Sequence, residues 1–179
     1  MPFQNPEPSE IKALLARVHT IAVVGLSPKP NRPSYYVAQA LQGFGYRIIP
    51  VRALPGSERV QILGELAYNK LAEVPEPIDL VDAFRAAEHI NGLVDECIHL
   101  KLPALWIQQG IVNLPAAERA RAAGIFTVMD RCLYKDYVAL MAERRRQAVP
   151  HLAHAQAIVR TGDDIAERPR STHDHCPCG

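Results

Sequence analysis

Continuous apolar runs alternate along the chain with stretches in which apolar residues recur every three or four positions. The runs are typical of strands buried on both faces, and the second pattern is typical of amphipathic helices. The runs predict five main strands, at residues 21–25, 47–51, 78–84, 104–107 and 126–129. The helical pattern predicts five main helices, at residues 9–19, 33–44, 86–101, 114–123 and 133–146, and a short helix at 68–73.

The starts of several helices carry their own signals. Ser9 and Asn113 can act as N-caps, and Pro33 and Pro115 stand in a first turn, where proline is well tolerated. Strands that alternate with helices predict an α/β fold, namely a Rossmann-like, doubly wound, mostly parallel five-stranded sheet with helices on both faces. Ligands of such sheets bind outside the carboxyl ends of the strands, so the residues that follow each strand are the candidates for function.

Composition narrows the class of protein. The chain has 179 residues, of which 48% are hydrophobic and 22% are charged, as is usual for a globular domain. A formal net charge of +1 gives no basic field that would attract nucleic acid. The sequence shows neither an apolar run of about 20 residues nor the features of a signal peptide, so we expect a soluble, cytoplasmic protein.

The end of the chain differs in character from the rest. We expect a domain over residues 1–150 and a flexible C-terminal extension over residues 151–179, within which 151–160 could lengthen a helix. The extension holds four possible metal ligands, His173, His175, Cys176 and Cys178. Because they fall within six residues, they cannot easily surround one tetrahedral ion, and we favour an unstructured tail over a metal site.

The loop after the first strand has the features of an anion site. A dinucleotide fingerprint would place glycines two and five positions after Gly25, and neither position holds one. The loop instead offers backbone N–H groups, the Ser27 and Ser34 hydroxyls, Lys29 and Arg32, next to a helix N-terminus. It predicts a phosphate site unlike that of standard NAD enzymes. The alternative is a rigid proline loop with solvated charges.

The later strand ends add further candidates. Arg52 stands where NAD-binding folds place an acid, and an arginine there suits a ribose phosphate, unless it is simply solvated. Phe84 can line an adenine or pantetheine channel or belong to the core. Gln109 can bind a pantetheine amide, and Gly110 permits a close approach of the backbone. Cys132 fits a buried, inert thiol better than a reactive one.

These strand ends resemble the CoA-binding domain family, the small stand-alone proteins similar to the N-terminal domain of the succinyl-CoA synthetase α subunit. The matching segments follow in order at residues 23–30, 32–35, 45–51, 62–65, 81–85, 106–111 and 128–132. The resemblance implies a CoA-binding Rossmann fold, in which the proline-rich first loop surrounds the CoA phosphates. Where the family shows Val-Asn-Pro, this chain has Val51-Arg52-Ala53, and Arg52 could instead pair with the 3′-phosphate.

The resemblance implies that the cofactor is coenzyme A. By the same resemblance Phe84 and Arg85 lie beside the ligand, and residues 109–111 flank the pantetheine. The residues that we predict to bind the cofactor are Gly25, Leu26, Ser27, Pro28, Lys29, Arg32, Pro33, Ser34, Arg52, Phe84, Arg85, Gln109, Gly110 and Ile111.

The sequence assembles no acid–base set. His89 and His99 fall on the third predicted helix, and Asp79 and Asp82 lie on opposite faces of one strand. We therefore predict non-catalytic binding of CoA or an acyl-CoA, a small-molecule ligand, with no nucleic acid, no membrane and no identified protein partner. Two alternatives stay open. One is an NADP-linked oxidoreductase, which Arg52 favours and the missing glycines oppose, and the other is a partner subunit of an acyl-CoA ligase.

Overall fold

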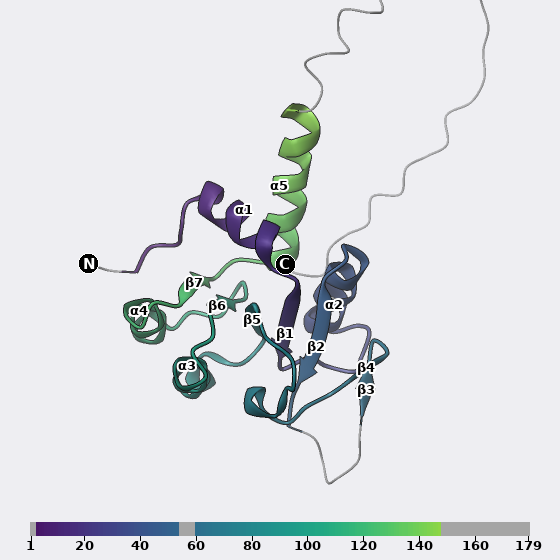
Figure 1. Ribbon diagram of the computed structural model, residues 1–179, viewed down its shortest axis with the longest axis vertical. Coiled ribbons are helices and arrows are strands. Elements are labelled where there is room, and N and C mark those ends of the chain that lie inside the picture. Colours follow the sequence, from purple (N-terminus) through teal and green to yellow (C-terminus); the bar gives the residue numbers. More distant parts are fainter. Residues whose placement is uncertain (1–2, 54–59, 148–179) are drawn as a thin grey trace, which may run out of the picture.

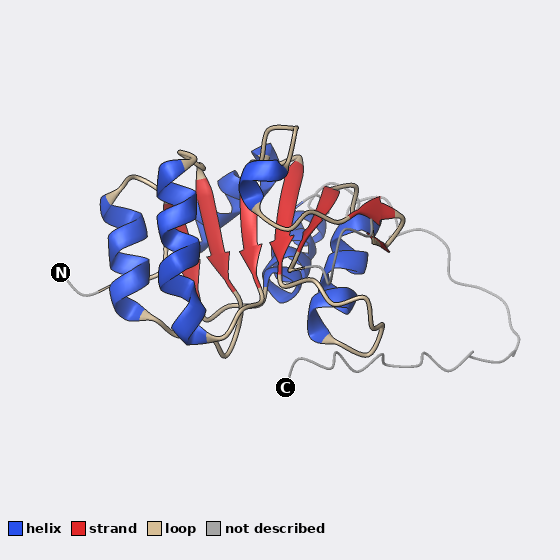
Figure 2. Ribbon diagram, turned by 90° about the horizontal axis from the view of Figure 1, so that it is seen from below, coloured by secondary structure: helices blue, strands red, loops and turns tan. Residues whose placement is uncertain are grey.

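A five-stranded parallel sheet forms the centre of the computed structural model, which describes residues 3–53 and 60–147. The strand order is β2-β1-β5-β6-β7 (Figure 1), and Figure 2 shows the strands of the sheet as neighbouring red arrows. The strands are β1 (Thr20–Val24), β2 (Arg47–Val51), β5 (Leu80–Ala83), β6 (Ala104–Ile107) and β7 (Phe126–Met129). This arrangement confirms the predicted α/β fold, and three of the strands have the predicted bounds.

Five α-helices cover both faces of the sheet. They are α1 (Pro8–Arg17), α2 (Pro33–Gly43), α3 (Ile90–His99), α4 (Leu114–Ala122) and α5 (Leu133–Gln147). Figure 1 shows α3 and α4 on one side of the sheet and α1, α2 and α5 on the other. Because side chains alternate along a strand, Ile21 and Val23 pack with the α1, α2 and α5 side, and Ala22 and Val24 pack with α3 and α4.

Segments between β2 and α3 differ from the predictions. Two short strands, β3 (Gln61–Ile62) and β4 (Glu65–Leu66), form an antiparallel pair that the hydrophobic pattern does not predict. Two residues are too few to show a period of two, and only the turn at Leu63 and Gly64, both with positive φ, marks the hairpin. The predicted helix at 68–73 is a single 3₁₀ turn, η1 (Leu71–Glu73), and the helix predicted from residue 86 begins as another, η2 (Ala87–His89).

The two predicted N-caps have different outcomes. Asn113 caps α4, since its side chain accepts a hydrogen bond from the Ala116 N–H at 3.1 Å. The prediction for Ser9 is wrong, because α1 begins one residue earlier, at Pro8, and Ser9 lies in the first turn. The Glu10 carboxylate accepts the Glu7 N–H at 2.8 Å and so satisfies a group at that end of the helix.

The N-terminal segment covers the outer edge of β7. The Asn5 amide accepts the Met129 N–H and donates to the Met129 carbonyl, both at 2.8 Å. One side chain thus imitates a neighbouring strand and occupies part of an edge that would otherwise be open to other chains.

Two further expectations concern membrane-spanning helices and the C-terminal extension. No helix of residues 3–53 and 60–147 is long and apolar enough to cross a membrane. The predicted C-terminal extension, residues 151–179, lies outside the described residues together with its histidines and cysteines.

Candidate functional site

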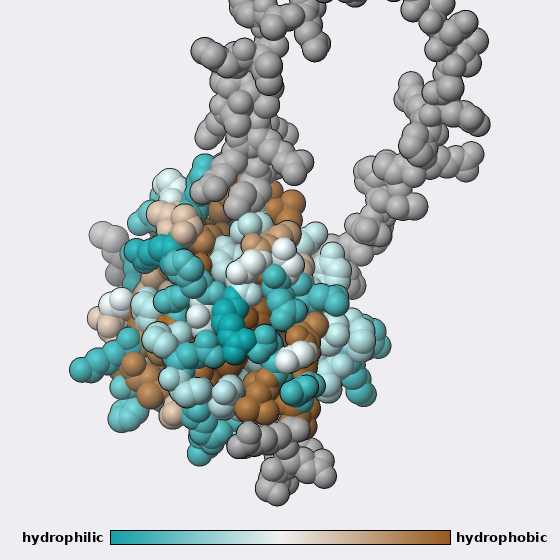
Figure 3. Space-filling model, turned by 45° about the vertical axis from the view of Figure 1, so that its right-hand side comes forward, coloured by the Kyte–Doolittle hydropathy of each residue, from teal (hydrophilic) through white to brown (hydrophobic). Residues whose placement is uncertain are grey.

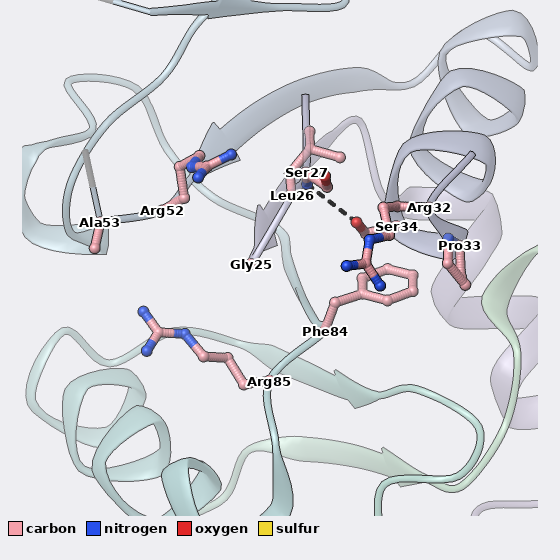
Figure 4. Close-up of a pocket in the computed structure, with 10 residues that line it drawn as sticks. All are labelled: Gly25, Leu26, Ser27, Arg32, Pro33, Ser34, Arg52, Ala53, Phe84 and Arg85. Carbon is pink, nitrogen blue, oxygen red and sulfur yellow. Dashed lines mark hydrogen bonds between the residues drawn. The ribbon is translucent and has the colours of Figure 1, made fainter. Parts of the chain in front are cut away.

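The order of the strands reverses beside β1. The chain passes from β1 to β2 on one side and later adds β5 on the other, so a crevice opens between the loops that follow β1 and β5. A cavity of about 520 Å³ lies at this point (Figure 4). Its walls come from the segments that follow β1, β2 and β5 and from the start of α2. The lining residues are Gly25, Leu26, Ser27, Arg32, Pro33, Ser34, Arg52, Ala53, Phe84 and Arg85.

Most of the predicted binding residues therefore meet at one place, and a few do not. Pro28 and Lys29 are exposed in the same loop but do not line the cavity. Residues 109–111 also lie outside its lining, on the loop that follows β6. Ala53 also lines the cavity, although it is not among the predicted binding residues; its place directly after Arg52, at the end of β2, was the available signal.

Gly25 allows the loops after β1 and β5 to cross closely. Its φ is +90°, and a Cβ at this position would clash with the Phe84 carbonyl oxygen. Two backbone hydrogen bonds fix the crossing, from the Gly25 N–H to Val51 O and from the Phe84 N–H to Val24 O, both at 2.8 Å. A glycine is required here by the packing of the protein itself.

The start of α2 presents polar groups to the cavity. The buried Ser34 hydroxyl accepts the Ser27 N–H at 3.1 Å, which folds the first loop back onto the helix. The Ser27 hydroxyl in turn accepts the Lys29 N–H at 3.2 Å. Arg32 occupies the N-cap position but its side chain makes no capping hydrogen bond. The Tyr35 and Tyr36 N–H groups donate to the Arg32 carbonyl oxygen, so the helix dipole, rather than a set of free amides, favours an anion at this end of α2.

Three arginines on three different segments line this cavity. Arg52 and Arg85 are half-buried and Arg32 is exposed, and Figure 4 shows Arg32 apart from the other two. Among the residues that the structure describes, none of the three forms an ion pair. Three other arginines do pair with carboxylates: Arg47, Arg119 and Arg131. The cavity thus concentrates positive charge that no acidic side chain of the described part balances.

Backbone hydrogen bonds fix the position of Arg52. Its N–H donates to the Tyr68 carbonyl oxygen at 2.8 Å, and the Tyr68 N–H donates to Pro50 O at 2.9 Å. The segment after the β3–β4 hairpin therefore pairs with the end of β2 and fixes the base of the Arg52 side chain. The hairpin contributes to the site through this contact.

The loop after β6 is tied to the end of β7 and the start of α5. The Gly110 N–H donates to the Asp130 carboxylate at 2.7 Å, and Lys135 Nζ donates to Gln109 Oε1 at 3.2 Å. Gly110 has φ +83°, a backbone conformation that favours glycine. This loop stands on the same carboxyl edge of the sheet as the cavity.

A buried carboxyl group lies in the strand that leads to Phe84. Asp82 is fully buried in β5, and its Oδ1 accepts a hydrogen bond from Gln108 Nε2 at 2.7 Å. Burial raises the pKa of Asp82 to about 7, and the Gln108 hydrogen bond acts in the opposite direction. The sequence alone does not predict this pair; an aspartate inside an otherwise apolar strand was the one signal of it.

A second cleft adjoins the first on the α3 side of the sheet. Its volume is about 370 Å³, and Arg85 lines both spaces. Polar side chains from the segment after the hairpin, from η2 and from α3 line it, including Lys70, His89 and Glu96. The described residues include no group of three His, Cys, Asp or Glu side chains placed to hold a metal ion. Cys132 is buried in the core.

One face of the molecule is largely polar. The face shown in Figure 3 carries mostly hydrophilic residues, with smaller hydrophobic areas between them. The exposed large hydrophobic side chains of the described part are Phe44, Val112, Leu114 and Val138. None of these four lines the cavity at the end of β1.

Comparisons with known proteins agree with this fold. YneT of Bacillus subtilis (strain 168) is 42% identical over 131 residues, which cover 73% of this chain and 94% of YneT. The structure of cell-free ID.343 from Thermus thermophilus gives a TM-score of 0.70 at 33% identity, covering 75% of this chain and 99% of that one. A hypothetical protein from Pyrococcus horikoshii OT3 gives a TM-score of 0.71 at 28% identity, covering 79% and 96%.

A family model gives the most direct assignment. The model of the CoA binding domain matches residues 19–137, more than half of the chain. The match begins just before β1 and ends in α5, so it spans all five strands of the central sheet and the cavity at their carboxyl ends. On this evidence the chain belongs to the CoA binding domain family.

Proposed function

We propose that the chain binds coenzyme A or an acyl-CoA in the cavity at the end of β1, without catalysing a reaction on it. Family membership supports the ligand, and one observation carries the site: three arginines without ion pairs in the described part surround a single cavity at a helix N-terminus. CoA carries a pyrophosphate and a separate 3′-phosphate, so it offers anionic groups at more than one position.

The pyrophosphate belongs beside the start of α2. The dipole of that helix end favours an anion, and the Ser27 hydroxyl and the Arg32 guanidinium can both donate to phosphate oxygens. Lys29, exposed in the same loop, adds positive charge at the mouth. This arrangement replaces the glycine-rich approach of standard dinucleotide sites with hydroxyl and guanidinium donors.

The 3′-phosphate belongs between Arg52 and Arg85. Both guanidiniums are half-buried, which strengthens their interaction with an anion relative to a fully solvated pair. Arg52 follows β2, the position from which Rossmann folds contact the ribose. From there the pantetheine would pass Phe84 and continue toward residues 109–111 on the same edge of the sheet.

The lining of the cavity supports binding over catalysis. The ionisable side chains of its described lining are arginines, which stay protonated in proteins and cannot act as a general base. No carboxylate, histidine, lysine or cysteine is among the lining residues that the structure describes. These residues can hold and orient an anionic ligand, but none of them suits proton transfer.

Calorimetric titration tests the proposal with three ligands: CoA, dephospho-CoA and NADPH. We expect CoA to bind best and dephospho-CoA to bind roughly 10- to 100-fold more weakly, since a charged hydrogen bond contributes about 1.5–3 kcal/mol. Arg52→Ala should weaken the binding of CoA and leave the affinity for dephospho-CoA unchanged. Arg17→Ala, which removes an exposed arginine of α1 outside the cavity lining, is the matched control and should change neither.

Two results would reject the site as proposed. Equal affinity for CoA and dephospho-CoA would show that the protein makes no favourable contact with the 3′-phosphate. Tight binding of NADPH with no binding of CoA would favour the NADP-linked alternative, which Arg52 and Arg85 would also suit.

A further inference from the structure

Asp82 is the exception among the buried polar side chains. The described part of the chain buries four of them: Ser34, Asp82, Gln108 and Thr127. Ser34 accepts the Ser27 N–H, and the Thr127 hydroxyl donates to Ile125 O at 2.9 Å. Asp82 Oδ2 alone has no hydrogen-bond partner. An unpartnered oxygen on a fully buried carboxyl group is costly, and so calls for an explanation.

The position of the pair links it to the candidate site. Asp82 lies in register between Val23 of β1 and Trp106 of β6, so it occupies the middle of the sheet. Phe84, two residues later, points to the same face one layer nearer the carboxyl edge. Gln108 directly follows β6, and its N–H also donates to Ala83 O at 3.3 Å. The pair thus joins the ends of β5 and β6 just before the loops at 84–85 and 109–111.

We infer that the Asp82–Gln108 pair is a brace that positions the loops after β5 and β6 for the ligand, and that it holds them fully only while the Asp82 carboxyl is protonated. This inference rests on the proposed function for the identity of the ligand. Asp82 is a positioning residue in this account, because the cavity lining does not include it.

Protonation matters because of what surrounds the carboxyl group. In the neutral acid, Oδ1 accepts from Gln108 and Oδ2 carries no charge. Ionisation would strengthen the Gln108 hydrogen bond to Oδ1, but it would also place charge on Oδ2, a buried oxygen that has no donor. We expect the carboxylate to draw in water or to move, and either change loosens the joint between the two strand ends.

No cation of the described part compensates such a charge. The titratable side chains in the core on this side of the sheet, from α2, α5, the residue before β2 and the loop after β7, are Tyr35, Tyr36, Tyr46, Cys132, Tyr134 and Tyr137. None of them is positively charged. At the carboxyl edge, Arg32 and Arg85 line the cavity and Arg131 pairs with Asp136, and none of these arginines hydrogen-bonds to Asp82. The high pKa of Asp82, about 7, has burial as its main cause and agrees with this geometry.

Affinity for CoA across pH 5.5–8.5 tests the inference. In the wild type we expect affinity to fall by at least about fivefold as pH rises through 7, the lower end of ordinary coupling between sites. Asp82→Asn keeps the shape of the side chain but cannot ionise, so its affinity for CoA should not fall in this way. The CoA phosphate also titrates near pH 6, and the wild-type profile is therefore compared with that of Asp82→Asn. Asp95→Asn, an exposed carboxylate of α3, should behave as wild type.

A second measurement needs no ligand and no variant. NMR titration of the side-chain carboxyls should give Asp82 a midpoint near 7, and amide exchange at Gln109 and Gly110 should accelerate above it. An Asp82 midpoint below 5, or the same pH profile in Asp82→Asn, would overturn the brace. If CoA does not bind at any pH, the proposed function fails, and these ligand-free results still decide on the brace.

Discussion

Gly25 shows how one residue makes the crossing at the site possible. The loops after β1 and β5 approach until only a hydrogen atom fits between Gly25 and the Phe84 carbonyl, and the backbone adopts φ +90°. Both conditions exclude a side chain. The cavity depends on this crossing, because Gly25, Phe84 and the residues that follow them form its floor and walls.

Gly25→Ala should therefore lower the free energy of unfolding by at least about 2 kcal/mol, from positive-φ strain and the clash together. Gly92→Ala is the matched control: Gly92 lies in α3, and a Cβ there meets nothing within 4 Å. It should raise stability by roughly 0.5–1 kcal/mol. Urea unfolding measures both, and equal effects of the two variants would contradict the role assigned to Gly25.

Some properties of single residues could be predicted from the sequence, and others depend on the fold. The strand-end positions and the first-loop hydroxyls could be predicted, because motif residues lie close together in the chain. The lack of ion pairs at Arg32, Arg52 and Arg85 could not, since pairing depends on which carboxylates the fold brings near. Asp82 was visible as a polar residue in an apolar strand, but its partner Gln108 lies 26 residues away.

Among the elements, β7 depends on a segment far from it in sequence. The Asn5 side chain makes two hydrogen bonds to the Met129 backbone, across a separation of 124 residues. No local pattern predicts such a contact, just as none predicts the two-residue strands of the β3–β4 hairpin. Long apolar strands and capped helices, by contrast, were predictable because each one repeats its signal several times.

Asn5→Ala should cost about 1–3 kcal/mol of stability, because each hydrogen bond contributes roughly 0.5–1.5 kcal/mol. It should also speed amide exchange at Met129. Gln4→Ala is the control, because the bond recorded at Gln4 uses its backbone carbonyl oxygen and survives the change. If Asn5→Ala left both the unfolding midpoint and Met129 exchange as in wild type, the pairing of the edge would be refuted.

For the whole molecule, the buried carboxyl predicts how stability depends on pH. Asp82 has a raised pKa of about 7 in the folded state and an ordinary value of 3.8 once exposed by unfolding. The folded state therefore keeps a proton that the unfolded chain releases, and this contribution is complete below pH 3.8. It declines as pH rises and is lost once pH has passed about 7.

Denaturant unfolding at pH 5, 6, 7, 8 and 9 tests this pH dependence of stability. The free energy of unfolding of the wild type should decline with pH relative to that of Asp82→Asn, and the two curves should run parallel above pH 8. Parallel curves across the whole range would show that Asp82 is ionised in the folded protein at all these values.

The central claim is that CoA occupies the cavity at the end of β1, and a crystal structure of the chain grown with CoA tests it most directly. We predict density for the pyrophosphate at Ser27, Arg32 and the first turn of α2, with the 3′-phosphate at Arg52 and Arg85. CoA bound elsewhere on the molecule, with this cavity filled only by solvent, would contradict the account.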